Sequence, residues 1–170
     1  MKEIIHNEKN IHEEDVNTVI KRAKLVVENS KGEILLGHTD DSYYLLGGHV
    51  EGEESDQTCL CREIKEEAGI DYIPKIDKPF CVIKYYTKDY PHEGDVTLFL
   101  ANYYAIKDDI EPNYDKVQLT NGEAITHFKL VNVKREDCIS ELTRYLDICK
   151  HKNVVQDTLD VLKEYLHNSQ

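Results

Sequence analysis

The stretch that decides the fold is residues 48–70, which read GHVEGEESDQTCLCREIKEEAGI. It predicts a glycine loop that leads into a short acidic helix. Ser55 or Asp56 is expected to cap the helix start, because either side chain can accept a backbone N–H of the first turn. Gly69 is expected to end the helix, because glycine readily takes the left-handed conformation that stops one.

Three carboxylates share one side of this predicted helix. At about 100° per residue, Glu63, Glu66 and Glu67 fall within a sector of about 100°. The stripe beside them is apolar and is expected to face the core; it contains Leu60, Ile64 and Ala68. Like charges at this spacing repel each other. They indicate either a solvated acidic face or a bound cation, and oxygen ligands favour Mg²⁺ or Mn²⁺.

The surrounding pattern favours the cation, because it resembles the Nudix box, the signature of the Nudix hydrolases. Every fixed position matches: Gly48, Glu54, Arg62, Glu63, Ile64, Glu66, Glu67, Gly69 and Ile70. From average residue usage, a chance match is on the order of 10⁻⁹ per starting position. The resemblance implies an α/β/α sandwich with a mixed β-sheet, a catalytic loop and helix, and C-terminal helices. It also implies metal-dependent hydrolysis of a nucleoside diphosphate linked to another group.

The resemblance implies roles for the box residues. Glu63 and Glu67 are expected to hold the principal Mg²⁺ or Mn²⁺ ion, with the carbonyl of Gly47 as a further candidate ligand. Glu66 is either another ligand or the base that takes a proton from water. Two loop carboxylates, Glu93 and Glu123, are alternative contributors, although ordinary surface charge explains each of them more simply.

Other box residues are expected to support the site. Arg62 is expected to reach Glu54 and to hold the loop and helix together through a charge-assisted fork. Gly48 and Gly69 are expected to serve backbone geometry. Substrate-binding residues are not assigned, but several tyrosines offer stacking faces. They are Tyr43, Tyr44, Tyr85, Tyr86, Tyr90 and Tyr103.

Composition narrows the possible partners. The chain has 170 residues, which suits one domain, and a net charge of −12. Duplex nucleic acid is therefore not an expected partner, since no basic footprint exists. Bound divalent ions would let an acidic protein act on phosphates. No apolar run has the length of a membrane span and the first residues lack a signal-peptide core, so a cytoplasmic protein is expected. Reduced thiols are expected at Cys59, Cys61, Cys81, Cys138 and Cys149.

The predicted organisation has three parts. Residues 1–20 form an N-terminal extension that serves as an edge strand, a flap or a dimer contact. Residues 21–150 form the hydrolase domain, and residues 151–170 form a C-terminal helix packed on it. Strands are expected at residues 21–28, 33–38, 43–46, 80–88, 96–106 and 124–131. Helices are expected near residues 139–149 and 155–166, the second packing locally or supporting a homodimer.

Three functions are compatible with the sequence. The first is a pyrophosphohydrolase that acts on a small-molecule nucleotide and releases a nucleoside monophosphate. Its substrate would be a nucleoside triphosphate, a dinucleoside polyphosphate or a nucleotide sugar. The second is a non-catalytic nucleotide or ADP-ribose sensor, which the three intact box carboxylates disfavour. The third is a prenyl diphosphate isomerase, for which the sequence holds no second catalytic motif.

Overall fold

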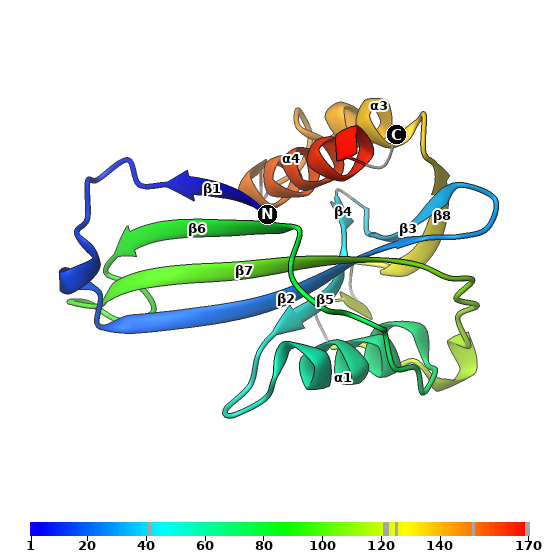
Figure 1. Cartoon of the computed structure of the whole chain (residues 1–170), viewed down its shortest axis with the longest axis horizontal. Helices are drawn as coiled ribbons and strands as arrows, with labels where there is room; N and C mark the ends of the chain where they lie inside the picture. Colours follow the sequence, from blue (N-terminus) through cyan, green and yellow to red (C-terminus); the bar gives the residue numbers. More distant parts are fainter. Residues whose placement is uncertain (41, 121–122, 125, 151, 169–170) are drawn as a thin grey trace.

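The protein has a mixed α/β fold built on one twisted β-sheet (Figure 1). The computed structural model describes residues 1–40, 42–120, 123–124, 126–150 and 152–168. Within them the sheet has eight strands, in the order β1-β6-β7-β2-β3-β4, with β5 paired to β2 and β8 paired to β3. The strands are β1 (Lys2–His6), β2 (Thr18–Glu28), β3 (Glu33–His38), β4 (Tyr43–Tyr44), β5 (Leu46–His49), β6 (Cys81–Lys88), β7 (Val96–Lys107) and β8 (Lys129–Lys134).

The sheet is mixed because two of its pairings are parallel. Strand β1 runs parallel to β6 at one edge, and β2 runs parallel to β7 over its full length. The other pairings are antiparallel, including β6 with β7 and β2 with β5. The two long strands β2 and β7 therefore form the spine to which the shorter strands attach.

Helices cover both faces of this sheet. Helix α1 (Asp56–Ala68) lies on one face, and α3 (Cys138–Tyr145) and α4 (Lys152–Asn168) lie on the other (Figure 1). Two short 3₁₀ turns, η1 (Glu13–Asp15) and η2 (Tyr114–Lys116), complete the described elements. This is the predicted α/β/α arrangement. A search of the described residues finds no helix that is long and apolar enough to cross a membrane.

Helix α1 begins and ends where the sequence predicts. The Ser55 hydroxyl accepts the backbone N–H of Thr58 at 3.1 Å, so Ser55 rather than Asp56 is the cap. Gly69 ends the helix with φ of 68°. The predicted apolar stripe is confirmed: Leu60, Ile64 and Ala68 are fully buried, and they pack with alternate residues of β2.

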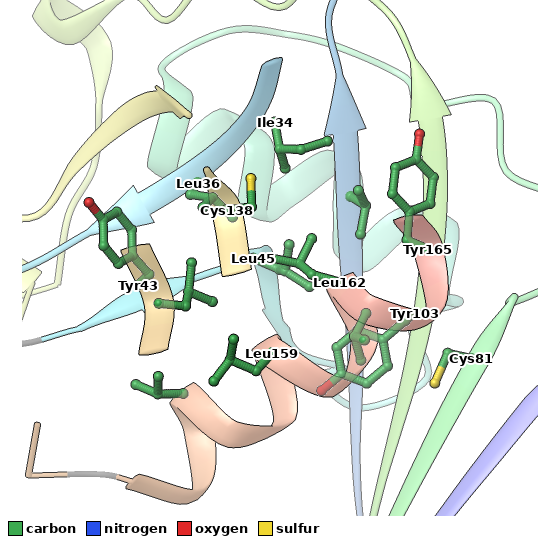
Figure 2. Packing of buried hydrophobic residues seen from close by; sticks show 14 of the residues in the cluster. Ile34, Leu36, Tyr43, Leu45, Cys81, Tyr103, Cys138, Leu159, Leu162 and Tyr165 are labelled. Carbon is green, nitrogen blue, oxygen red and sulfur yellow. The ribbon is translucent and has the colours of Figure 1, made fainter. Parts of the chain in front are cut away.

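The second core lies between the sheet and the C-terminal helices. Leu159 and Leu162 of α4 and Cys138 of α3 meet Ile34 and Leu36 of β3 (Figure 2). The sequence leaves open whether the last helix packs locally or supports a dimer. In the structure α4 packs on the sheet beside α3, and a homodimer stays a prediction. All five cysteines are free thiols.

The predicted last strand is wrong in position. The sequence predicts a strand at residues 124–131, of which residue 125 lies outside the described residues, whereas β8 spans Lys129–Lys134. The backbone N–H of Phe128 bonds the carbonyl of Glu123 at 3.0 Å, which closes a turn. His127 has φ of 54°, a left-handed conformation that an extended strand cannot contain. The strand therefore starts only after this turn.

A buried carboxylate ties α4 to the sheet. Glu28, at the end of β2, is 6% exposed. Arg135 Nη1 lies 3.1 Å from each of its oxygens, and the Tyr165 hydroxyl of α4 donates to Oε2. Burial alone would raise the pKa of Glu28, but the hydrogen bonds from Tyr165 and Arg135 outweigh it and lower that pKa.

Replacing Glu28 with Gln should destabilise the fold by about 3 kcal/mol, because the Arg135 charge loses its buried partner. Denaturant unfolding measures the change. Glu111→Gln, at an exposed position after β7, is the matched control and should change stability by less than about 0.5 kcal/mol.

The stability difference between wild type and Glu28→Gln should depend on pH. A lowered folded pKa gives stabilisation that is present above the unfolded value of about 4.3 and is lost as pH falls through the folded pKa. The gap between wild type and Glu28→Gln should therefore narrow in acid, and an equal gap at all pH values would contradict this assignment.

Candidate active site

The loop between β5 and α1 is fastened to the helix by Arg62. Arg62 Nε donates to Glu54 Oε1 at 2.9 Å, and Nη2 donates to Glu54 Oε2 at 3.1 Å. This two-pronged fork is the predicted pairing. Arg62 Nη2 also donates to the carbonyl of His49 at 2.8 Å. One guanidinium group therefore holds both ends of the loop against the first turns of α1.

The same guanidinium contacts two of the three box carboxylates. Arg62 Nη1 lies 2.9 Å from Glu63 Oε1 and 3.2 Å from Glu66 Oε2. Glu63 is largely buried, whereas the Glu66 side chain is 37% exposed. The sequence predicts a pairing of Arg62 with Glu54, but not these further contacts. They place the arginine among the carboxylates as a positive counter-charge.

The sequence predicts a loop at the two glycines, but Gly47 and Gly48 lie within strand β5, because both pair with β2. The third carboxylate turns toward this strand. Glu67 is 7% exposed, and its Oε2 accepts the backbone N–H of Gly47 at 3.0 Å. Lys24 lies opposite Gly47 in the pairing of β2 with β5. Its Nζ donates to the Gly47 carbonyl and to the Leu45 carbonyl. Gly47 thus offers its N–H to a carboxylate and its carbonyl to a lysine.

Burial shifts the pKa values of Glu67, Glu63 and Lys24. It raises the pKa of Glu67 to about 8, while Lys24 and the Gly47 N–H oppose the shift. Burial also raises the pKa of Glu63, against the opposing hydrogen bond from Arg62. It lowers the pKa of Lys24, and attraction from Glu67 and Glu63 counters that effect. The carboxylates and the two cations therefore form one electrostatic unit.

Two consecutive glycines let this unit form. A Cβ on Gly47 would lie 2.3 Å from the carbonyl oxygen of Ala23, and Gly47 has φ of 106°, which side chains other than glycine's rarely permit. A Cβ on Gly48 would lie 2.1 Å from Glu63 Oε1. Gly47 is required by its positive φ and by the nearby backbone of β2, whereas Gly48 leaves space for the Glu63 carboxylate.

The comparison with protein-family models gives one match, the NUDIX domain, over residues 20–135 and thus more than half of the chain. The chain belongs to the Nudix family. This confirms the resemblance drawn from the box and makes the chain a member of a family of pyrophosphohydrolases that typically depend on a divalent metal ion. A search of curated proteins finds no match.

Solved structures support the fold. A NUDIX hydrolase from Nitrosomonas europaea aligns with a TM-score of 0.55 and 16% identity, over 89% of this chain and 90% of that one. A mutator MutT protein from Bacillus halodurans aligns with a TM-score of 0.54 and 15% identity, over 87% and 82%. A MutT NUDIX hydrolase from Burkholderia pseudomallei aligns with a TM-score of 0.50 and 20% identity, over 71% and 86%. At these identities the likeness shows the fold alone.

The Nudix carboxylates do not converge on a common point in this structure. Among the described residues, no group of three or more His, Cys, Asp or Glu side chains has the arrangement of a metal centre. The contacts above explain this. Glu63 and Glu66 both accept hydrogen bonds from Arg62, whereas Glu67 accepts the backbone N–H of Gly47 instead. The donors themselves, three carboxylates and one carbonyl, are the oxygen ligands that Mg²⁺ and Mn²⁺ prefer, so the residues fit such an ion.

The two loop carboxylates lie in different places. Glu123 is close enough to Glu67 to repel it electrostatically, although its carboxylate accepts hydrogen bonds from the backbone N–H and hydroxyl of Thr120. Glu93 lies in the turn between β6 and β7. That turn adjoins Asn17, just before β2, about 20 Å along the strand from Lys24. Cys59 packs under the loop, and burial raises the pKa of its thiol to about 11, as for a space-filling residue.

Sequence reasoning missed Lys24 and Arg22 at this site. Both lie on β2, on the face that also carries α4, and Arg22 Nε contacts His49 Nε2 at 3.3 Å. A signal existed, because Lys24 interrupts the apolar run from Ala23 to Val27. Its role depended on the register between β2 and β5, which local patterns do not reveal.

The two glycines should respond oppositely to the same added methyl group. Gly47→Ala should lose about 2–3 kcal/mol of stability or more, because a strained φ and a backbone clash must both be relieved. Gly48→Ala should lose less than about 1 kcal/mol, because the Glu63 side chain can rotate away. Denaturant unfolding of the two variants provides the measurement. Equal losses would show that the two positions are not distinguished as the structure requires.

Proposed function

We propose that this chain hydrolyses a phosphoanhydride bond in a nucleoside diphosphate linked to another group, using Mg²⁺ or Mn²⁺, and releases a nucleoside monophosphate. The observation that supports it most is that α1 brings three box carboxylates beside β5: Arg62 contacts Glu63 and Glu66, and Glu67 bonds Gly47, whose carbonyl is a further oxygen donor. This group offers hard oxygen donors in a partly buried place, as phosphate-bridging metal ions require.

The solvent exposure of the box carboxylates suggests a different role for each. Glu63, Glu67 and the Gly47 carbonyl would hold the ion, since they are the inner members of the group. When bound, the ion would supply charge neutralisation and a more acidic water. Glu66 is the most exposed of the three carboxylates, so it can meet water and accept its proton, or serve as an outer ligand. Arg62 would act as a positioning residue, because it holds Glu63 and Glu66 together.

A hollow on the α4 side of the sheet is the proposed site for the nucleobase. It has a volume of about 560 Å³. Its lining consists of Tyr85, Thr87, Tyr90, Phe99, Lys150, Lys152, Asn153 and Val154. The Tyr90 and Tyr85 rings lie 5.3 and 6.1 Å from the Phe99 ring, so the floor is aromatic. Aromatic faces stack on bases, and lysines attract phosphate.

Arg22 connects this hollow to the Nudix box. Its guanidinium carbon lies 5.7 Å from the centre of the Phe99 ring, and its Nε contacts His49 of the box loop. Phe99 pairs with Ile20, four residues before Lys24 on β2, a separation of about 13 Å. A nucleotide with its base at Phe99 would thus direct its phosphates along Arg22 toward the carboxylates.

The first experiment is a substrate panel. The protein is incubated with nucleoside triphosphates, dinucleoside polyphosphates, ADP-ribose and nucleotide sugars, with Mg²⁺ or Mn²⁺, and the released phosphate species are separated and quantified. The proposal expects a nucleoside monophosphate among the products. Binding without turnover across the panel would favour the alternative, a nucleotide or ADP-ribose sensor.

Replacing Glu66 with Gln should lower kcat by at least about 100-fold if it is the base. It should change the melting temperature little, because the side chain is partly exposed and Arg62 keeps its bonds to Glu54 and Glu63. Glu53→Gln, at an exposed position in the same loop, is the matched control and should keep normal turnover. Activity of Glu66→Gln within a few-fold of wild type would remove Glu66 from this role.

Replacing Tyr85 with Ala should raise KM for the nucleotide substrate about tenfold and leave kcat within about twofold. The reason is that stacking holds the base and does not touch the reacting phosphate. Tyr114→Ala removes another exposed tyrosine, on η2 beside α1 and outside the hollow, and should change neither constant. A fall in kcat without a change in KM would mean that the hollow does not bind the base.

A further inference from the structure

Lys24 is the least expected residue near the Nudix box. It stands within β2 between Ala23 and Leu25, two fully buried residues of the core beneath α1. Its side chain belongs to the opposite face of the sheet, together with that of Arg22. In the β2–β5 register its direct partner is Gly47. The strand pairing therefore fixes the start of this side chain beside Gly47 of β5, one of the proposed metal ligands.

The end of the side chain lies on a proposed ligand. Lys24 Nζ donates to the Gly47 carbonyl and, at 3.2 Å, to the Leu45 carbonyl. Gly47 in turn donates its N–H to Glu67. Glu67 and Glu63 are the two carboxylates that attract Lys24 most strongly. The ammonium thus meets the same carbonyl, and feels the same negative charges, that a divalent ion would use.

Buried carboxylates need a cation nearby, because an uncompensated charge in the interior costs several kcal/mol. Arg62 supplies one such charge to Glu63 and Glu66, and it is held by six contacts to the loop and helix. Glu67 instead accepts the Gly47 N–H, and the contacts of Arg62 go to Glu54, Glu63, Glu66, His49 and Cys59. Lys24 is the cation that offsets the negative charge of Glu67.

We propose that the Lys24 ammonium substitutes for a divalent ion at the Gly47 carbonyl and Glu67 in the metal-free protein, and that it must leave this position when the ion binds. Two cations at one carbonyl repel each other, so both cannot stay. Lys24 is the one that moves, because its flexible stem carries a single point charge, whereas Arg62 is fixed by a planar fork. The inference rests on the proposed metal-dependent function.

This displacement has two measurable consequences. The first is that Lys24 weakens metal binding, since the ion must compete with a tethered charge. The second is that Lys24 stabilises the protein when metal is absent. A merely structural lysine would give neither effect in this combination, because its removal would leave metal affinity unchanged or lower it.

The test compares Lys24→Met with wild type, using Mn²⁺ as the probe and electron paramagnetic resonance to count free Mn²⁺. Methionine keeps most of the stem and removes the charge. Lys24→Met should bind Mn²⁺ about tenfold more tightly or better. Its melting temperature should be lower than that of wild type without metal and should rise more on adding Mn²⁺. Lys21→Met, at an exposed lysine of the same strand, is the control and should match wild type in both measurements.

A second measurement uses the wild-type chain and does not depend on the variant folding. Reductive methylation followed by mass spectrometry reports the accessibility of each lysine. Adding Mg²⁺ should increase the modification of Lys24 several-fold and leave Lys21 unchanged. Unchanged labelling of Lys24, or equal or weaker Mn²⁺ binding by folded Lys24→Met, would overturn the inference while leaving the proposed function in place. If wild type binds no Mn²⁺ and turns over no substrate, the proposed function and the inference are both wrong.

Discussion

The structure depends on positive charges that offset three carboxylates beside the two glycines of β5. Helix α1 brings these carboxylates to the strand, and Glu67 among them is almost completely buried. Like charges at this spacing repel, and a buried charge without a partner costs several kcal/mol. Arg62 and Lys24 supply the opposite charges. These two cations therefore offset the buried negative charge where helix, loop and central strand pack together.

The site is assembled from segments that lie far apart in the sequence. Strand β2 brings Lys24, β5 brings Gly47, and α1 brings Glu67, a span of more than 40 residues. The hydrogen bond from Gly47 to Glu67 joins sheet to helix directly. A Cβ at Gly47 would strike the Ala23 carbonyl of β2 and would lie 3.0 Å from Leu60 Cδ2 of α1, so only glycine fits between the strand and the helix at this position. The requirement for glycine is thus a packing requirement first, and its chemical benefit follows from the closeness that it permits.

Sequence reasoning succeeded where local interactions decide the structure. The bounds of α1 follow from Ser55 and Gly69, and its buried stripe follows from helical periodicity. The Arg62–Glu54 fork follows from their spacing together with the family pattern. These features are determined within one stretch of 23 residues, so the stretch alone was enough to predict them.

Sequence reasoning failed where contacts between distant segments, or unusual backbone dihedral angles, determine the structure. The last strand starts late because His127 takes a left-handed conformation, which no composition signal announced. Lys24 looked like one polar residue in a strand, and only the pairing with Gly47 gives it a role. The contacts of Arg62 with Glu63 and Glu66 were missed because side-chain conformers, rather than helical spacing, select them.

The distribution of charge gives the two faces of the sheet different roles. The chain carries a net charge of −12, yet Arg22, Lys150 and Lys152 gather around or beside the aromatic hollow under α4. A local basic path on an acidic protein attracts phosphate at short range, while the overall charge attracts metal cations. Under the proposed function, the α1 face would carry the residues for chemistry, and the α4 face would carry those for recognition. Arg22 touches both, through Phe99 on one side and His49 on the other, so it is the residue through which changes in recognition would reach the chemistry.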